Sequence, residues 1–283
     1  MSTIFDVSKK GAGEETPIRT NFHSHTTRCN HAIGSDEDYV KAAIAAGFSQ
    51  LGMSDHSPFP DHMGQVSDMR MHVTQFPDYM ASARALQAQY AGQIDLFIGL
   101  EAEYYPQYHS WLMEQKAQAG LDFLILGSHY DDPVEMTYFG AVTDPKLVRR
   151  YVRHTIAGLE TGDFCALAHP ELFMLSYPRF DKDCQQASLE LIRAAKALDI
   201  PLEYNLAGLY PHSWRRGPGY PTPGFWEMAA EEGAKAIIGL DAHDPARYAD
   251  THLYDQAVAD LTAMGIPLVR SLVPCGHKQK KAM

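Results

Sequence analysis

The sequence predicts a single-domain α/β barrel or near-barrel. Seven short apolar runs alternate with longer amphipathic runs along the 283 residues. A strict alternation of strand and helix indicates parallel strands joined by helical crossovers, and seven such units are too many for a small sheet. The doubly wound open sheet is the alternative, but no G-x-G-x-x-G pattern follows the first strand.

The predicted strands are short and apolar, which is typical of strands that are covered on both faces. In chain order they are Ile18–Phe22, Gln50–Met53, Asp95–Leu100, Phe123–Gly127, Phe164–Ala168, Pro201–Tyr204 and Lys235–Leu240. The last apolar segment, Pro267–Leu272, fits either an eighth strand or a strand outside the barrel, and the sequence leaves both open.

The predicted helices lie between these strands and after the last of them. They are Asp36–Ala46, Gln75–Gln89, His109–Ala119, Pro145–Thr161, Gln185–Leu198, Pro223–Glu232 and Tyr254–Met264. Ser35 fits an N-cap in front of an acidic first turn, whereas Gly47 and Gly233 fit the C-terminal ends of their helices.

We expect one domain over residues 17–274, between an N-terminal extension at 1–16 and a basic tail at 275–283. The 35 aspartates and glutamates outnumber the 24 lysines and arginines, so the formal charge is -11. Such a field repels polyanions, and we therefore expect no nucleic-acid partner, although local cations can still hold one small anion. Because no apolar stretch reaches 18 residues, we also expect no membrane span.

The cysteines bear on the compartment. Cys29, Cys165, Cys184 and Cys275 include no C-x-x-C pair, and a chain of this length is too long for a small disulfide scaffold. The N-terminal segment has no long apolar run of the kind found in signal peptides. Together these features favour a reduced cytoplasm.

Side chains of metal-ligating type follow nearly every predicted strand. The carboxyl ends of strands in a parallel barrel share one face, where active sites lie. A single histidine after a strand is more often a core residue, but packing gives no reason to repeat it after six strands, and burying so many titratable groups without a metal would be costly. Imidazole suits zinc, iron and manganese, and a carboxylate can bridge two ions. The predicted metal ligands are His23, His25, His31, His56, Glu101, His129, His169, Asp241 and His243.

The same residues lie in motifs whose order resembles the PHP (polymerase and histidinol phosphatase) superfamily, in its histidinol-phosphate phosphatase type. The motifs are H-S-H-T at 23–26, S-D-H at 54–56, G-L-E at 99–101, G-S-H at 127–129, A-H-P at 168–170 and G-L-D-A-H at 239–243. The stretch E-Y-N-L-A-G at 203–208, followed by G-Y-P-T-P at 219–223, is similar to that branch. The motifs span most of the chain, and as an ordered set they are highly specific.

The resemblance implies a distorted (β/α)7 TIM-like barrel that binds three divalent metal ions, which would be zinc, iron or manganese. By motif the ligands form three sets, one for each ion: His23, His25, Glu101 and Asp241; Glu101 with His129 and His169; and His31, His56 and His243. The implied activity is hydrolysis of a small phosphate monoester, with L-histidinol phosphate as the leading substrate, by a hydroxide that bridges two of the ions.

Glu101, Asp241 and His243 are the predicted catalytic residues, and a metal-bound water, Asp241 or His243 would give the leaving oxygen its proton. The phosphatase branch usually has a basic residue after E-x-N-x-x-G-L, but this chain has Tyr210 there. The predicted substrate-binding residues are Arg179, Glu203, Asn205, Arg215 and Arg216. The alternative for the loop arginines is a solvated charge, and for Glu203 and Asn205 a structural hydrogen bond. Asp55 is expected to orient the ligand histidine that follows it.

Two other functions stay open at this stage. One is a phosphoesterase of the same fold that acts on a nucleotide or a sugar phosphate. The other is a non-catalytic barrel that keeps metal for stability or binds a partner. Metal-dependent amide hydrolysis on a related barrel loses ground, because the fourth strand ends in Ser128-His129 rather than in a lysine. We expect a small phosphorylated substrate as the partner, and the sequence does not fix the oligomeric state.

Overall fold

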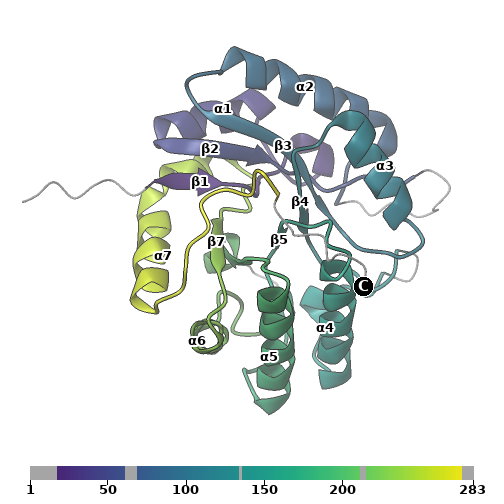
Figure 1. The fold of residues 1–283 in the computed structure, drawn as a ribbon, viewed down its shortest axis with the longest axis vertical. Helices are drawn as coiled ribbons and strands as arrows, with labels where there is room; N and C mark the ends of the chain where they lie inside the picture. Colours follow the sequence, from purple (N-terminus) through teal and green to yellow (C-terminus); the bar gives the residue numbers. More distant parts are fainter. Residues whose placement is uncertain (1–17, 61–68, 134–135, 211–214, 276–283) are drawn as a thin grey trace, which may run out of the picture.

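The computed structural model describes residues 18–60, 69–133, 136–210 and 215–275. Its seven strands are all parallel and form one sheet in chain order, with the helices arranged around them (Figure 1). The strands are β1 (Arg19–Asn21), β2 (Phe48–Met53), β3 (Asp95–Ala102), β4 (Phe123–Leu126), β5 (Ala166–Leu167), β6 (Leu202–Asn205) and β7 (Ala236–Gly239). The expectation of a distorted (β/α)7 barrel is confirmed.

Each strand is followed by one α-helix. The helices are α1 (Asp36–Ala45), α2 (Phe76–Gln89), α3 (His109–Ala119), α4 (Pro145–Leu159), α5 (Lys182–Ala197), α6 (Pro223–Glu232) and α7 (Thr251–Ala263). Ser35 caps α1 in a reciprocal capping box with Asp38, as its N-cap assignment anticipated. Helix α5 begins three residues earlier than predicted, because the Asp181 side chain accepts hydrogen bonds from the N–H groups of Asp183 and Cys184.

The barrel closes between β1 and β7 through the backbone that carries the predicted metal ligands. Just beyond the two strands, Ser24 and Ala242 form a parallel bridge. The N–H of His25 donates to the carbonyl of Ala242 over 3.0 Å, and the N–H of Ala242 donates to the carbonyl of His23 over 3.2 Å. Residues from opposite ends of the chain are thereby fixed side by side at the carboxyl-end rim.

At the other end of the barrel, the segment after α7 runs back across the strands. Leu268 forms a single bridge with Ala236, at the beginning of β7, and within the described residues this segment forms no eighth strand. Leu272 is buried in the barrel interior with Phe22, Phe123 and Ile237. The segment thus packs against the apolar side chains inside the barrel.

A disulfide joins Cys165, just before β5, to Cys275. The cysteine pattern gave no reason to expect it, because the two residues are 110 positions apart in the sequence and belong to no motif. Cys29 and Cys184 are buried free thiols. The extension at 1–16 and nearly all of the tail at 275–283 lie outside the described residues. In the described part, no helix is long and apolar enough to cross a membrane.

Candidate metal centre

Glu101, at the end of β3, is the centre of a cluster of imidazoles. Its Oε2 lies 2.9 Å from Nδ1 of His56, 3.4 Å from Nε2 of His23 and 3.7 Å from Nε2 of His25. Its Oε1 lies 2.9 Å from Nε2 of His169 and 3.4 Å from Nε2 of His129. One carboxylate therefore faces five histidines from four different motifs, which is the geometry expected of a bridging ligand.

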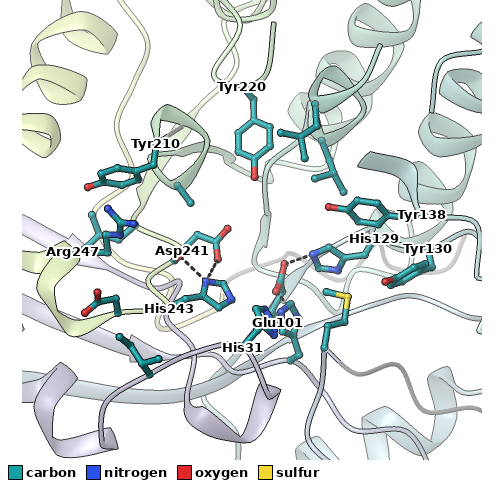
Figure 2. A pocket seen from close by; sticks show the side chains of 18 residues that line it. His31, Glu101, His129, Tyr130, Tyr138, Tyr210, Tyr220, Asp241, His243 and Arg247 are labelled. Carbon is teal, nitrogen blue, oxygen red and sulfur yellow. Dashed lines mark hydrogen bonds and ion pairs between the residues drawn. The ribbon is translucent and has the colours of Figure 1, made fainter. Parts of the chain in front are cut away.

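Asp241, just after β7, is the second carboxylate of the cluster. Its Oδ1 lies 3.0 Å from Nε2 of His25 and 3.4 Å from Nε2 of His23. His243 extends the cluster towards His31, with ring centroids 4.5 Å apart (Figure 2). The structure thus brings all nine predicted ligands together at one rim.

The donor atoms fall into tight groups in which all ligand atoms lie within 4.8 Å of one another. Four of these groups are His31, His56 and His243; His23, His25 and Glu101; His23, His169 and Asp241; and His56, Glu101 and His129. The first matches the set that we expected for one ion. The second lies within the expected set that also contains Asp241. The last two divide the predicted ligands differently, because His169 groups with His23 and Asp241 rather than with His129.

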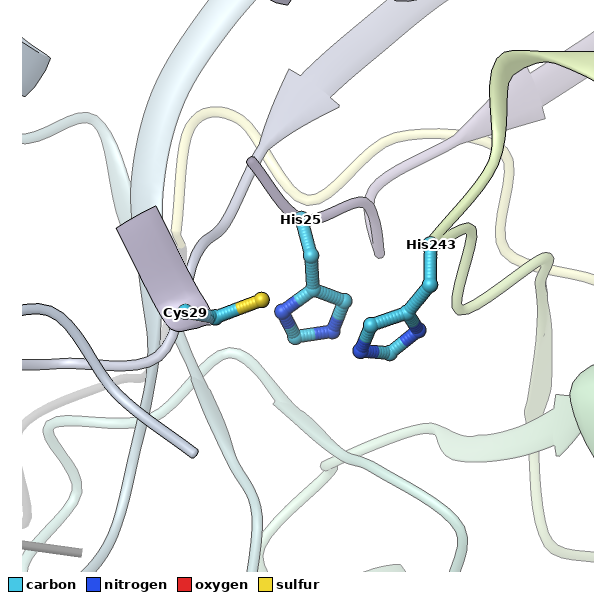
Figure 3. Close-up of side chains that lie close together, drawn as sticks. All are labelled: His25, Cys29 and His243. Atoms are coloured by element: carbon cyan, nitrogen blue, oxygen red, sulfur yellow. The ribbon is translucent and has the colours of Figure 1, made fainter. Parts of the chain in front are cut away.

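A fifth group contains Cys29, which the sequence analysis did not connect with the site. It consists of His25, Cys29 and His243. Figure 3 shows the Cys29 sulfur beside the His25 ring, on the side away from His243. Cys29 lies two positions before His31, but a lone cysteine in the sequence gave no signal of this contact.

Several histidines are fixed through the ring nitrogen that faces away from the cluster. Nδ1 of His23 donates to Oε1 of Glu203 over 2.7 Å. Nδ1 of His31 donates to the carbonyl of Cys29 over 2.8 Å, and Nδ1 of His243 to the carbonyl of Asp241 over 3.0 Å. Such bonds set the tautomer and leave Nε2 as the basic nitrogen, which is how metal-binding histidines are usually held.

The donor set fits divalent metal ions by a test that is independent of its sequence motifs. Buried polar atoms in proteins nearly always have hydrogen-bond partners, and an exception needs an explanation. In the described part of the chain, buried atoms of the cluster without such a partner are Nε2 of His23 and of His243, Nδ1 of His25, of His129 and of His169, and Oε2 of Glu101. All six residues belong to the tight groups, so cations bound there could satisfy several of these atoms.

Burial and the neighbouring charges shift the pKa values of several cluster residues. Burial raises the pKa of Glu101, but the surrounding His129, His23 and His56 outweigh burial and hold that pKa well below its usual range. Burial, followed by the charge of His25, lowers the pKa of His243 to about 3. These two effects favour the forms that bind metals, an ionised carboxylate and a neutral imidazole. His25 shows the opposite effect: burial lowers its pKa, but its contacts with Asp241 and Asp55 outweigh burial and raise that pKa to about 9.

The local backbone is shaped for these side chains. His169 and Asp241 adopt positive φ values of 28° and 47°, which non-glycine residues seldom do and which concentrate at functional sites. Gly127 follows β4, where a Cβ would overlap the Glu101 carboxylate, and Gly239 likewise makes room for Glu203. Because these two glycines have no Cβ, the acidic side chains of the neighbouring strands fit beside them.

Two residues predicted to bind substrate are instead used inside the barrel. Glu203 is 4% exposed, and besides His23 it accepts hydrogen bonds from the N–H of His169 and from Nδ2 of Asn205. Nδ2 of Asn205 also contacts Oδ2 of Asp241 over 3.1 Å, and its Oδ1 accepts from the N–H of Ala207. Their polar atoms are occupied, so the structural alternative holds and both residues orient metal-ligand side chains.

The three arginines expected to bind phosphate do not line the cavity beside the cluster. The side chain of Arg179 is 83% exposed and has only a loose contact with Asp181, at 3.9 Å. Arg215 turns back onto its own loop and donates to the carbonyls of Gly217 and Gly208. Arg216 is exposed. That they bind substrate stays a prediction, but in the described geometry loop hydrogen bonds and solvent exposure place their guanidinium groups away from the cavity lining.

Asp55 orients a different histidine from the one expected. Its Oδ1 accepts the backbone N–H of His56 over 2.8 Å, but none of its described contacts is with the ring of His56. The ring that it faces is that of His25, whose Nδ1 lies 3.5 Å from the same Oδ1. The hydroxyl of Thr26 donates to its other oxygen. Asp55 therefore supports the His25 ring across the β1–β2 boundary.

A buried ion pair beside the cluster involves Arg70, which no sequence motif singled out. Nη2 of Arg70 lies 2.6 Å from Oε1 of Glu103, and both side chains are almost completely buried. Oε1 of Glu103 also lies 3.4 Å from Nδ1 of His129, and the Arg70 guanidinium stacks on Phe59 at 4.1 Å. The sequence indicates this pair only weakly, because its two residues are 33 positions apart.

A cavity of about 540 Å³ opens over the cluster (Figure 2). Its polar lining includes the predicted ligands His31, Glu101, His129, Asp241 and His243, and its outer wall includes Tyr130, Tyr138, Tyr210, Tyr220 and Arg247. The hydroxyls of Tyr138 and Tyr220 point into it (Figure 2). A volume of this size is typical of small-molecule sites.

A parallel (β/α)7 barrel that collects seven histidines and two carboxylates at the carboxyl-end rim defines a class of protein, in which the barrel mouth holds a divalent-metal centre. Residues 21–207, more than half of the chain, match the PHP domain family. This chain belongs to the PHP domain family.

Curated relatives with this domain share most of their length with the chain. The probable histidinol-phosphatase of Deinococcus radiodurans is 30% identical over 240 residues, which cover 81% of this chain and 89% of that protein. The histidinol-phosphatase of Bacillus subtilis is 25% identical over 197 residues, which cover 68% of this chain and 69% of that protein.

Solved structures share the fold. The histidinol phosphate phosphatase of Lactococcus lactis, in a complex with zinc, L-histidinol and phosphate, superposes with a TM-score of 0.66 at 19% identity, covering 88% of this chain and 95% of that one. The putative histidinol phosphatase of Listeria monocytogenes gives a TM-score of 0.67 at 17% identity, covering 81% of this chain and 97% of that one.

Proposed function

We propose that this protein is a metal-dependent phosphatase that hydrolyses L-histidinol phosphate to L-histidinol and phosphate. The observation that carries the proposal is the arrangement of nine ligand side chains around Glu101, beside a cavity large enough for a small ester. The Deinococcus and Bacillus relatives, both named as histidinol-phosphatases, support the choice of substrate.

The proposed cofactor is a set of about three divalent ions, and zinc, iron and manganese all suit imidazole and carboxylate ligands. Zinc has the additional support of the Lactococcus complex. The proposed ligands are the nine residues predicted from the sequence, with Glu101 as the bridge. Bound ions would lower the pKa of water and neutralise phosphate oxygens, which are the two requirements of this reaction.

The residues of the chain have separable tasks in this reaction. Glu203 and Asp55 hold the rings of His23 and His25 in position. Asp241 lines the cavity, where its carboxylate can take the proton that an attacking water loses and return it to the leaving oxygen. His243, from the same loop, is the neighbouring candidate for that transfer. No side-chain nucleophile is needed.

The outer cavity suits the organic part of the substrate. The apolar side chains of Leu172 and Leu175 form one part of the wall, and the phenols of Tyr138 and Tyr220 supply hydroxyl groups. Such a mixture of apolar surface and a few polar groups is what recognises a small amphipathic ligand. The cytoplasmic location stays a prediction, and the Cys165–Cys275 disulfide is instead typical of oxidising compartments.

The test is phosphate release by the metal-loaded protein from L-histidinol phosphate, a nucleoside monophosphate, a sugar phosphate and p-nitrophenyl phosphate. We expect the highest kcat/KM with L-histidinol phosphate, and its loss in Glu101→Gln. A higher kcat/KM with a nucleotide or sugar ester would show that this ester, and not L-histidinol phosphate, is the preferred substrate. No release from any ester by a chain with full metal content would favour the non-catalytic barrel.

A further inference from the structure

One cation of the cavity wall has no role in the site described so far. Arg247 lies in the short 3-10 helix Pro245–Ala249, four residues after His243, and its side chain lines the cavity. Among the described residues that line the cavity, it is the one lysine or arginine. The neighbouring Asp244 also lines the cavity, but its Oδ1 accepts the N–H of Ala246 as the cap of the same helix.

The guanidinium group of Arg247 is held by stacking rather than by an acid. Its central carbon lies 3.6 Å from the centroid of the Tyr210 ring, close to van der Waals contact (Figure 2). Within the described part of the chain, no carboxylate forms an ion pair with it. A guanidinium that stacks through its face keeps the N–H groups in its plane available, and these groups match the oxygens of phosphate.

The position of Tyr210 links this pair to an expectation from the sequence. Tyr210 follows β6 where the histidinol-phosphatase branch usually has a basic residue. The three arginines that we expected to compensate face solvent or their own loop. Arg247 reaches the same place from the loop after β7, with the Tyr210 ring beneath it.

We propose that Arg247, supported by Tyr210, binds the phosphate group of the substrate through the non-bridging oxygens. This inference rests on the proposed function, because it assigns the anion-binding part of the same cavity. Tyr210 acts as a positioning residue: its ring fixes the plane of the guanidinium and leaves the N–H edge free. The recognised chemistry is a phosphate dianion, either on the ester or as free inorganic phosphate.

The test compares Arg247→Ala, Arg247→Lys, Tyr210→Ala and Tyr210→Phe with Arg193→Ala, a matched control. Arg193 lies on the outer face of α5, where it pairs with Glu232. The readouts are KM and kcat for the ester, the inhibition constant of inorganic phosphate, and the metal content. Calorimetric titration of inorganic phosphate into the metal-loaded protein gives a measurement that needs no turnover.

For Arg247→Ala we expect a rise of about 10- to 100-fold in KM and in the dissociation constant of phosphate, with unchanged metal content, because a charge-assisted bond is lost. Arg247→Lys should recover part of the loss. Tyr210→Phe should match the wild type because the stacking ring remains, whereas Tyr210→Ala should weaken phosphate binding.

Unchanged phosphate affinity in Arg247→Ala would overturn the inference, and so would a loss of metal in that variant. If the wild type released no phosphate from any ester, the proposed function would fail, but the calorimetric comparison would still decide whether Arg247 binds phosphate. A Tyr210→Phe variant as weak as Tyr210→Ala would contradict the stacking role.

Discussion

Oε1 of Glu203 accepts a hydrogen bond from Nδ1 of His23 over 2.7 Å, inside the barrel and away from the cavity. The same carboxylate accepts the N–H of His169, so one buried acid positions two proposed ligands. Glu203→Gln should break one of the two contacts, because an amide accepts through its oxygen only and cannot accept on both sides. We expect a loss of about 10- to 100-fold in zinc affinity. Competition with a chelating dye measures it, with the exposed Glu190→Gln as the control; equal affinity in the two variants would contradict this role.

Gly127 leaves the space that the Glu101 carboxylate occupies. We expect Gly127→Ala to displace that carboxylate and to lower both metal content and phosphate release. Gly92→Ala is the control, because Gly92 has a φ of +81° and open space around it. It should cost about 1–2 kcal/mol of stability through backbone strain but leave metal content intact. Full metal content in Gly127→Ala would show that the site tolerates a shift of Glu101.

The Arg70–Glu103 pair predicts a large effect on stability. Removing one partner of a buried ion pair leaves the other charge unpaired, so Arg70→Met should lower the free energy of unfolding by about 3–5 kcal/mol. The double variant Arg70→Met, Glu103→Gln should recover part of that loss. Urea denaturation measures both, with Arg193→Ala as a surface control expected near zero. A loss below about 1 kcal/mol in Arg70→Met would mean that solvent reaches the pair.

The disulfide determines how many cysteine thiols should react before and after reduction. Unfolded without a reductant, the chain should show two reactive thiols, those of Cys29 and Cys184, and after reduction it should show four. In the native protein at pH 8, Cys184 should react slowly, because burial raises its pKa to about 12 and thiolate is the reactive form. Four thiols before reduction would show that Cys165 and Cys275 are unpaired in the purified protein.

The rim of metal ligands was predictable because it depends on topology rather than on side-chain packing. Once parallel strands alternate with helices, the residues that follow each strand share one end of the barrel, and His129 and Asp241 therefore line the same cavity although they are 112 positions apart in the sequence. Closure was not predictable in the same way, because the bridge between Ser24 and Ala242 lies outside both strands and follows no sequence pattern.

The division of the polar residues between cavity and barrel interior required coordinates. Glu203 lies in β6 as Glu101 lies near the end of β3, but the direction of its side chain depends on the space above Gly239 on the next strand. The partnership of Arg247 with Tyr210 depends on how two loops meet, 37 positions apart in the sequence. Single-sequence patterns contain no information on such contacts, so the sequence pointed to the arginines nearest the expected motif and not to Arg247.

The most direct test of the central claim is the metal content of the purified protein, measured together with phosphate release from L-histidinol phosphate before and after chelation. The account predicts about three divalent ions per chain, loss of activity and a lower melting temperature when they are removed, and recovery of both on adding them back. A folded chain that binds no divalent ions, or that hydrolyses the ester equally well without them, would contradict it.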